Sequence, residues 1–588
     1  MATRDWSPPD GLRGPAGVIR LTASQLDPGD RRCPEFAALK ARPQVWPRQS
    51  ERRRFPPWED FPLGLVMEAL DAVEFDGFEL DDAVERVLRE SRSPAHPGAA
   101  VWVRHACHAY VEASAWVTDE LAGEGVRLRP ERQARVVQHG SAVEMRVLTA
   151  WGRWYASPDG TVREFRRLRI SRSGDAGAPS TAAAAFVTAA GLRAFGSVYR
   201  ELPVEVGPDD AEAARVRVVE VVLDSDAPPK VLFDGTPEEA RRVYGERARP
   251  VAADLIRGGS RRPGSDCADC KIRTGCEALP HASGLLGLDD RGTHRRTWSI
   301  TTARRYQICP ARAHLRDLHV PGGPAAQGPA VRRGVVVHEW LRIAHGRPGA
   351  HPCSAADLPE GDPGFAAEFM TPEEYREARA YLLGHVEVCP LRQVHEEVVT
   401  EPKIAAYDPA ADVVVVADPD LIARGGGRVL YREQKTTVSP DRFGADEALE
   451  QVPQLALAVL LIAHGVFGST AGTVELEVMT PIGAAVHAFD ATDPAVLTEA
   501  RRVIARLVRD WHRDVRFDAR PGPWCAGCTV ARWCPDHREH DPAAPIEVDG
   551  VLIDPRTGEV LGTADAVSGR AAAVSADLVE PETEEVPF

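Results

Sequence analysis

The clearest hydrophobic pattern in the chain is an unbroken run of four valines at 413–416, bounded by polar residues. A strand that is covered on both faces is apolar without alternation, so this run predicts a buried central β-strand. The strand ends at Asp420, and a glycine turn at 425–427 precedes a second predicted strand over 428–435. The pattern therefore predicts a β-hairpin that delivers charged side chains to one place.

The charged side chains of this hairpin form a recognisable set. Glu433 and Lys435 lie two apart on a strand and share one face, and the hairpin brings Asp420 alongside them. Carboxylates suit a hard cation such as Mg²⁺ or Mn²⁺, and a nearby ammonium can orient an attacking water. An alternative is a solvated hairpin with a surface ion pair. The scarcity of lysine, five residues against 66 arginines, favours a functional role for Lys435.

Other segments of the chain predict further helices and strands. Residues 447–464 predict a largely apolar buried helix, and 474–479 predict a strand. Residues 493–515 predict an amphipathic, arginine-rich helix with Asp493 as its N-cap. Thr371 and the proline after it predict the start of a further helix.

Eight of the eleven cysteines form two copies of one pattern. Each copy is a C-x2-C-x5-C run with a distant cysteine upstream, and the two copies are Cys33 with Cys267, Cys270 and Cys276, and Cys309 with Cys525, Cys528 and Cys534. Four thiolates can hold an iron–sulfur cluster or a tetrahedral Zn²⁺, and spacing alone leaves both open. The remaining cysteines, Cys107, Cys353 and Cys389, have no paired spacing and are interpreted as buried apolar residues.

The repeated pattern predicts two copies of one domain. We place the first domain at residues 1–285, a linker at 286–298 and the second domain at 299–541. Residues 542–588 are expected to form a hairpin followed by an acidic disordered tail. A metal bound by each cysteine set would link the beginning of its domain, which carries the single cysteine, to the end, which carries the C-x2-C-x5-C run.

The hairpin and its surroundings resemble the PD-(D/E)xK nuclease superfamily, specifically its RecB-like branch with an iron–sulfur cluster. The strand end 417–420 is similar to the family's G-x-x-D motif, and 433–436 matches (D/E)-x-K-T. His338, within 334–341, matches the histidine expected on an upstream helix. The resemblance implies α/β restriction-endonuclease-like domains, each with a central mixed sheet flanked by helices.

The resemblance also implies roles for individual residues. Asp420, Glu433 and His338 would bind Mg²⁺ or Mn²⁺ with the backbone carbonyl of Gln434, and Lys435 would position the attacking water. The C-terminal cysteine set would hold a [4Fe–4S] cluster, and the N-terminal set would hold a second one. Gln454 matches the first residue of a Q-x-x-x-Y motif that contacts DNA, although alanine replaces the tyrosine.

The first copy lacks most of the expected active-site residues. Aligned with the second copy, it has Glu68 in place of His338, Tyr155 in place of Asp420, and Glu164 followed by Arg166 instead of lysine. Tyrosine is not a carboxylate ligand, and Glu164 beside Arg166 is typical of an ion pair. We therefore expect an N-terminal half that is catalytically inactive and keeps its cysteine-bound metal.

Composition limits the cellular setting. The net charge of −16 argues against a general polyanion-binding surface but allows a local basic groove. No stretch is long and apolar enough for a membrane span, and we expect a cytoplasmic protein. No P-loop motif is present, so a DNA nuclease here predicts a separately encoded helicase or ATPase partner. The alternatives are a non-catalytic DNA-binding scaffold with two metal-clipped modules and an RNA-directed nuclease.

Overall fold

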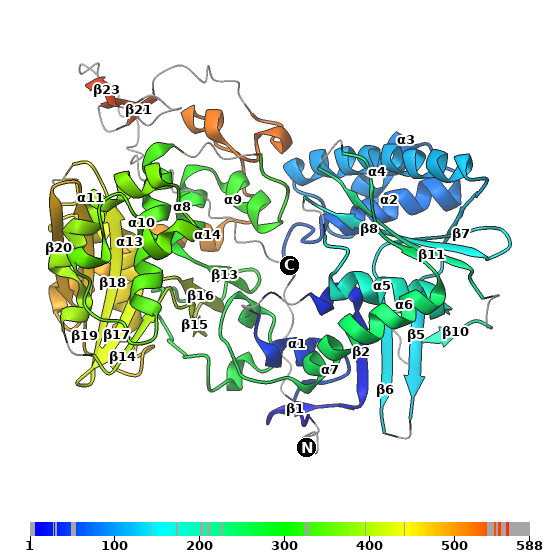
Figure 1. Ribbon diagram of the computed structural model, residues 1–588, viewed down its shortest axis with the longest axis horizontal. Helices are drawn as coiled ribbons and strands as arrows, with labels where there is room; N and C mark the ends of the chain where they lie inside the picture. Colours follow the sequence, from blue (N-terminus) through cyan, green and yellow to red (C-terminus); the bar gives the residue numbers. More distant parts are fainter. Residues whose placement is uncertain are drawn as a thin grey trace.

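The computed structural model describes residues 6–537, except for residues 28, 30–31, 49–54, 142, 172–173, 200–203, 209–211, 225–226, 324–327, 394 and 440–441, and three short strands after residue 545. Figure 1 shows two halves side by side, the N-terminal half from blue to green on the right and the C-terminal half from green to orange on the left. Both halves combine β-sheets with helices, which confirms the α/β class.

Two sheets form the framework of the C-terminal half. Their strands are β13 (Arg296–Trp298), β14 (Glu397–Thr400), β15 (Ile404–Asp408), β16 (Val413–Ala417), β17 (Leu421–Gly425), β18 (Arg428–Thr436), β19 (Gly472–Thr480) and β20 (Gly483–Asp490). The larger sheet has the order β14-β17-β18-β19-β20, in which β18 runs parallel to β19. The smaller sheet has the order β13-β16-β15.

Helices cover both faces of the larger sheet. They are α8 (Ile300–Ile308), α9 (Pro310–Asp317), α10 (Pro329–Gly346), α11 (Pro372–Val388), α12 (Ala448–Gln451), α13 (Pro453–Ala463) and α14 (Pro494–Arg513). The apolar α13 is buried between the sheet and α14, while α10 and α11 pack on the other face. Asp493 caps α14 by accepting a 2.7 Å hydrogen bond from the Ala495 N–H, as predicted.

The N-terminal half has its own pair of sheets. Their strands are β2 (Val18–Thr22), β4 (Arg129–Glu131), β5 (Arg135–Gly140), β6 (Met145–Thr149), β7 (Arg153–Ala156), β8 (Val162–Arg169), β9 (Leu192–Phe195), β10 (Glu205–Val206), β11 (Arg215–Val222) and β12 (Lys230–Gly235), with a separate pair β1 (Leu12–Arg13) and β3 (Trp46–Pro47). Its helices are α1 (Pro34–Lys40), α2 (Pro62–Asp76), α3 (Leu80–Glu90), α4 (Pro97–Gly123), α5 (Pro179–Ala190), α6 (Pro237–Val243) and α7 (Arg249–Arg257).

The strand orders of the two halves correspond. The N-terminal order β12-β11-β8-β7-β4 corresponds to β20-β19-β18-β17-β14, and the central pair is parallel in both. The order β5-β6-β2 likewise corresponds to β15-β16-β13, and again one neighbouring pair is parallel. In each half an apolar helix, α5 or α13, packs on one face of the larger sheet.

The valine strand and the charged strand are not hairpin partners, contrary to the sequence prediction. β16 belongs to the smaller sheet, and the chain leaves it at Asp418 and Pro419 before forming β17. The hairpin is β17 with β18, closed by Gly426 and Gly427 with φ of 56° and 72°. The prediction treated residues 413–420 as one strand, whereas β16 ends at Ala417, the Asp-Pro dipeptide at 418–419 turns the chain, and β17 begins at Leu421.

The stretch predicted as a linker is part of the C-terminal core. Leu286 is 1% exposed, and its backbone N–H donates a 3.0 Å hydrogen bond to Asp408. Residues 296–298 of the predicted linker form β13, which pairs with the valine strand β16. The change from one half to the other therefore lies earlier than residue 286, and the polar composition of this stretch conceals its buried leucines.

Each cysteine run packs against the opposite half of the molecule. Val530 and Trp533 share a hydrophobic cluster with Trp102 and Val103 of α4. Cys267 and Leu279 belong to a second cluster with Tyr407 of β15 and Val414 of β16. In Figure 1 the orange segment of the C-terminal half accordingly lies beside α4.

The C-terminal extension contains more structure than the predicted hairpin. Three strands, β21 (Ile546–Val548), β22 (Val551–Ile553) and β23 (Val560–Thr563), form an antiparallel sheet. The predicted acidic tail at 571–588 lies outside the described residues. Within the part of the chain that the structure describes, no helix has the length and hydropathy needed to cross a lipid bilayer.

Candidate functional site

Asp420 and Glu433 face each other across the β17–β18 hairpin. Leu421 pairs with Arg432, so extending the register by one position sets Asp420 opposite Glu433. The Asp420 carboxylate also accepts a 2.6 Å hydrogen bond from the Gln434 backbone N–H. The hairpin therefore brings together the two carboxylates that the sequence singles out.

His338 approaches this pair from α10. Its Nδ1 lies 2.9 Å from Asp420 Oδ1. Burial disfavours the charged imidazole, but the Asp420 carboxylate outweighs burial and raises the pKa of His338. Burial likewise disfavours the Asp420 carboxylate, but His338 lowers the pKa of Asp420 overall. The two groups are therefore in hydrogen-bonding contact inside the site, and they carry opposite charges whenever His338 is protonated.

Glu433 and Lys435 form a second pair on the same face of β18. The Lys435 Nζ lies 3.7 Å from Glu433 Oε2, and the Tyr431 hydroxyl donates a 3.2 Å hydrogen bond to Glu433 Oε1. Lys435 retains partial exposure, whereas Glu433 is almost completely buried. The lysine can therefore reach solvent at the point where the carboxylates converge.

Glu401 is a further acidic residue of the site that sequence reasoning missed. Its backbone N–H donates a 3.1 Å hydrogen bond to the Asp420 carbonyl, and it has a φ of 43°, a left-handed conformation that is rare for glutamate. Burial and then the negative charge of Asp420 raise the pKa of Glu401. Glu397, at the start of β14, instead pairs with Arg424 on the surface.

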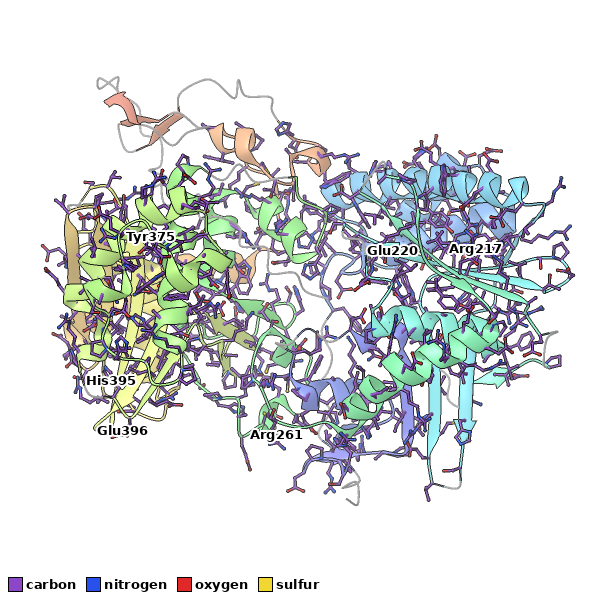
Figure 2. All side chains as sticks on the ribbon, viewed as in Figure 1. Arg217, Glu220, Arg261, Tyr375, His395 and Glu396 are labelled. Atoms are coloured by element: carbon purple, nitrogen blue, oxygen red, sulfur yellow. The ribbon has the colours of Figure 1, made fainter. Side chains whose placement is uncertain are left out.

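The site opens into a large cleft, of about 3550 Å³, that both halves line. Basic residues outnumber acidic ones in its lining although the chain is acidic overall. The N-terminal half contributes Arg20, Arg32, Lys40, Arg261, Arg262, Lys271 and Arg273. Figure 2 labels Arg261 near the boundary between the two halves. A basic groove within an acidic protein, which the sequence left open, is therefore present beside the carboxylates.

Gln454, the predicted DNA contact, lines the same cleft from the start of α13. Four residues later, Ala458 is fully buried in the hydrophobic core. The tyrosine of the Q-x-x-x-Y motif is therefore replaced by an alanine that apolar side chains enclose.

The C-terminal cysteine set gathers at one small pocket, where Cys309, Cys525, Cys528 and Cys534 all contribute to the lining. The single turns η8 (Pro523–Gly527) and η9 (Ala531–Trp533) shape the run. Backbone N–H groups donate 3.4 Å hydrogen bonds to two of the sulfurs, from Arg520 to Cys309 and from Gly522 to Cys525. Hydrogen bonds to sulfur are among the factors that tune iron–sulfur clusters.

The N-terminal cysteine set has the same arrangement. Arg262 donates a 3.4 Å hydrogen bond to Cys33, and Gly264 donates one of the same length to Cys267. Cys270 and Cys276 complete the set, and electrostatic interactions connect all four sulfurs. An Arg-Pro-Gly-x-x-Cys motif, at 262–267 and again at 520–525, provides these donors, and sequence reasoning overlooked it.

The spacing of the sulfurs bears on what they can hold. In the described chain, the metal-ligand atoms that gather within 4.8 Å belong to a different group, which contains none of these eight cysteines. Sulfurs around one tetrahedral Zn²⁺ stand about 3.8 Å apart, as its bond lengths require. In the described chain, therefore, neither cysteine set brings three sulfurs within 4.8 Å of one another.

The supposed active-site counterparts in the N-terminal half form a buried polar network. Arg166 Nε donates a 2.6 Å hydrogen bond to Glu164, which confirms the predicted ion pair, and Arg166 also contacts Ser114 of α4. The Tyr155 hydroxyl lies 2.7 Å from that of Tyr110, also on α4. These residues point to the face of the sheet that carries α4, whereas Phe165 between them packs with α5.

This orientation corrects the alignment of the two halves. Glu433 and Lys435 lie on the same face as Tyr431, which packs in the core with α13, the counterpart of α5. The N-terminal residues on that face are Phe165 and Arg167, not Glu164 and Arg166. A slip of one residue in aligning two strands reverses their faces, because successive side chains point to opposite sides of the sheet. Figure 2 labels Arg217 and Glu220 on the neighbouring β11, where Glu220 pairs with Arg167 and Arg169.

Comparison with known proteins gives one family match. Residues 297–535, less than half of the chain, match the family model described as the PD-(D/E)XK nuclease superfamily. No curated protein matches the chain at a significant level. The solved structure of SSO0001 aligns with 41% of this chain and 87% of its own length at 15% identity and a TM-score of 0.21, too low to carry an argument. The family match covers the positions of His338, Asp420, Glu433 and Lys435.

Proposed function

We propose that this protein is a metal-dependent deoxyribonuclease whose active centre is Asp420, Glu433, Lys435 and His338. The match to a nuclease superfamily over residues 297–535 supports nuclease chemistry. The observation that carries the assignment is the convergence of the His338–Asp420 pair and the Glu433–Lys435 pair on one hairpin that opens into a basic cleft. DNA is the proposed substrate because such a cleft attracts a polyanion.

The donor set fits a hard divalent cation. Asp420 and Glu433 would hold Mg²⁺ or Mn²⁺, with His338 and the Gln434 carbonyl as further ligands. The bound ion supplies Lewis-acid stabilisation of the charge that develops on the phosphate. His338 already contacts Asp420, so its neutral imidazole could join Asp420 as a ligand of the ion.

Lys435 has a separate task. Its ammonium lies 3.7 Å from Glu433 and partly reaches the cleft, so it can donate a hydrogen bond to a water that approaches a phosphodiester. It can also offset the negative charge of the phosphate during attack. Cleavage would transfer the water oxygen to phosphorus and release the 3′ or 5′ oxygen of the sugar as the leaving group.

The proposal includes a tandem architecture. The matching strand orders and the matching N–H to sulfur hydrogen bonds support two copies of one domain, each with a [4Fe–4S] cluster. The N-terminal copy would guide DNA without cutting it, because Arg167 and Phe165 occupy the face that carries Glu433 and Lys435 in the other copy. We further propose a separately encoded helicase or ATPase partner in repair or antiviral defence, and a cytoplasmic location.

The decisive experiment is cleavage of end-labelled DNA by the full-length, anaerobically purified chain with Mn²⁺ or Mg²⁺. We expect wild type to cut DNA, and Lys435→Ala to lose on the order of 10²-fold or more in rate while keeping its melting temperature. Lys403→Ala is the matched control, since Lys403 also lines the cleft but lies outside the carboxylate hairpin.

Three outcomes would contradict the proposal. Equal cleavage by wild type and Lys435→Ala would show that the active centre is assigned to the wrong residues. Cleavage confined to RNA would change the substrate. Tight DNA binding without cleavage under any divalent cation would favour a non-catalytic scaffold, which the missing tyrosine at Ala458 favours to a limited extent.

A further inference from the structure

Four side chains with nitrogen and sulfur donors converge inside the C-terminal half, away from both cysteine sets. His345 comes from the last turn of α10 and Cys353 from the segment that follows. His385 and Cys389 lie four residues apart at the end of α11, so they share one side of that helix. All four are buried, and one ligand atom from each lies within 4.8 Å of the others.

The separations match the edges of a tetrahedral metal site. The two imidazole Nε2 atoms are 3.2 Å apart, and His345 Nε2 lies 3.4 Å from Cys353 Sγ and 3.6 Å from Cys389 Sγ. Around a Zn²⁺ with ordinary bond lengths, two nitrogens stand about 3.3 Å apart and a nitrogen and a sulfur about 3.6 Å apart. The donor atoms thus already occupy the corners of a coordination polyhedron.

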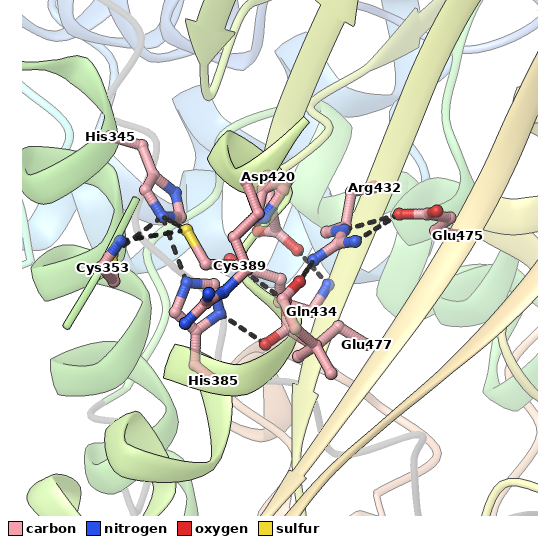
Figure 3. A network of polar contacts seen from close by, with 12 residues as sticks. His345, Cys353, His385, Cys389, Asp420, Arg432, Gln434, Glu475 and Glu477 are labelled. Carbon is pink, nitrogen blue, oxygen red and sulfur yellow. Dashed lines mark hydrogen bonds and ion pairs between the residues drawn. The ribbon is translucent and has the colours of Figure 1, made fainter. Parts of the chain in front are cut away.

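The groups behind the donors also fit a metal site. Glu477 Oε1 lies 2.5 Å from His385 Nδ1, and this contact fixes the imidazole with its Nε2 toward the cluster. The backbone N–H of Cys353 donates a 3.4 Å hydrogen bond to Cys389 Sγ, which favours a thiolate. Figure 3 shows the four donors and the carboxylate that supports one of them.

We propose that His345, Cys353, His385 and Cys389 bind one structural Zn²⁺. Two imidazoles and two cysteine sulfurs suit Zn²⁺ far better than Mg²⁺ or Ca²⁺, which prefer oxygen ligands. Four protein donors complete the tetrahedron and leave no open position, so the ion is structural. The site differs from the proposed nuclease centre and from both cysteine sets, and it does not depend on nuclease activity.

The ion would fasten a long irregular segment. Between α10 and α11, residues 347–371 contain only the short turns η5 (Ala355–Asp357) and η6 (Gly364–Glu368). Cys353 lies in this segment, His345 and His385 lie on the two flanking helices, and Cys389 directly follows α11. Binding therefore joins the end of α10 to the end of α11, and binding free energy becomes folding free energy.

The same site reaches the catalytic hairpin through one chain of contacts. Glu477, beside His385, accepts a 3.0 Å hydrogen bond from the Gln434 side chain, and the Gln434 backbone N–H donates to Asp420. Figure 3 shows this sequence of contacts from the His/Cys cluster to Asp420. The ion would thus hold in place His385 and Glu477, which support Gln434 of β18.

The direct test is zinc quantitation and zinc K-edge X-ray absorption on the full-length holoprotein, grown with zinc and purified without chelator. We expect about one zinc per chain, with a first shell of two nitrogens near 2.0–2.1 Å and two sulfurs near 2.3 Å. A four-sulfur shell would place the zinc in a cysteine set and overturn the proposal. A protein that holds no zinc after growth and zinc reconstitution would overturn it as well.

Variants provide an independent test. His385→Gln and Cys389→Ser should each lose at least about four-fifths of the zinc and melt at a lower temperature, with the iron content unchanged, because a single lost ligand opens the tetrahedron. Cys107→Ser is the matched control, since Cys107 is buried in another cluster and touches none of the four donors. If a variant does not fold, the absorption spectrum of wild type alone decides. Unchanged zinc in folded variants would contradict the assignment.

Discussion

The side-chain amide of Gln434 donates a 3.0 Å hydrogen bond to the carboxylate of Glu477. Gln434 lies between Glu433 and Lys435 on β18, so its side chain points to the opposite face of the sheet from theirs. Glu477 is completely buried and also pairs with His385 and Arg432. Glu477, His385 and Arg432 therefore form a buried charged network on the face of β18 opposite Glu433 and Lys435, and this network supports the proposed nuclease centre.

Replacing Glu477 with glutamine tests this layer. The change leaves the buried His385 without its carboxylate partner, while Arg432 keeps its ion pair with Glu475, so we expect the free energy of unfolding to fall by about 3–5 kcal/mol. Urea denaturation of the full chain would measure the loss. Glu397→Gln, which removes a surface ion pair with Arg424, should cost no more than about 1 kcal/mol. Equal stability of Glu477→Gln and wild type would refute a supporting role.

Glu401 is expected to strengthen cation binding. Its carboxylate carries negative charge beside Asp420, as the raised pKa of Glu401 reflects after the effect of burial. Glu401→Gln should raise the Mg²⁺ or Mn²⁺ concentration for half-maximal cleavage by about tenfold, equivalent to about 1.4 kcal/mol. The maximal rate at saturating cation should change little, and an unchanged cation dependence would exclude Glu401 from the site.

The two cysteine sets should contribute equally to the iron content. Anaerobically purified wild type is expected to contain about eight irons per chain, the sum of two four-iron clusters. Cys270→Ser and Cys528→Ser should each reduce this to about four, and the double variant should contain none. Iron and sulfide quantitation with the visible spectrum measures this. Zinc in place of iron would keep the duplicated architecture but remove the clusters.

His314 predicts a loss of stability in acid. Burial, then the nearby His96 and His294, lower its pKa to about 3, against about 6.5 in an unfolded chain. Between these values the unfolded state binds a proton that the folded state does not, so stability is complete above about pH 6.5 and falls as the pH falls. Going from pH 7 to 5 should cost about 2 kcal/mol.

A variant isolates this contribution of His314. The imidazole stacks on Phe517 with ring centroids 4.5 Å apart, so His314→Phe retains an aromatic ring without a titrating group. The difference in unfolding free energy between pH 7 and 5 should be about 2 kcal/mol smaller in the variant. Identical pH dependence in both proteins would show that His314 titrates normally.

The sequence could predict what local patterns encode. Glu433 and Lys435 are fixed by alternation along one strand, and Cys525, Cys528 and Cys534 by short spacings. The His345, Cys353, His385 and Cys389 cluster escaped prediction because the packing of two helices, not a sequence motif, brings its two pairs together. The four-residue spacing of His385 and Cys389 was a local sign of it.

Register was the other limit of prediction from sequence. The composition of β8 identified a strand related to β18, but the side chains of Glu164 and Phe165 point to opposite faces. Only the helices on each face, α4 and α5, reveal which of the two residues corresponds to Glu433. Glu401 was missed for a similar reason, because its nearness to Asp420 follows from a backbone hydrogen bond between distant segments.

The reciprocal packing of the cysteine runs explains why a half that lost its carboxylates would keep its thiols. Cys267 and Leu279 pack on Tyr407 and Val414 of the other half. Loss of structure around the N-terminal cysteines would therefore expose part of the hydrophobic core of the half that retains the carboxylates. Under the proposed function, selection on the nuclease centre would thereby extend to the N-terminal cysteine set. The two halves are inherited together because neither has a complete surface alone.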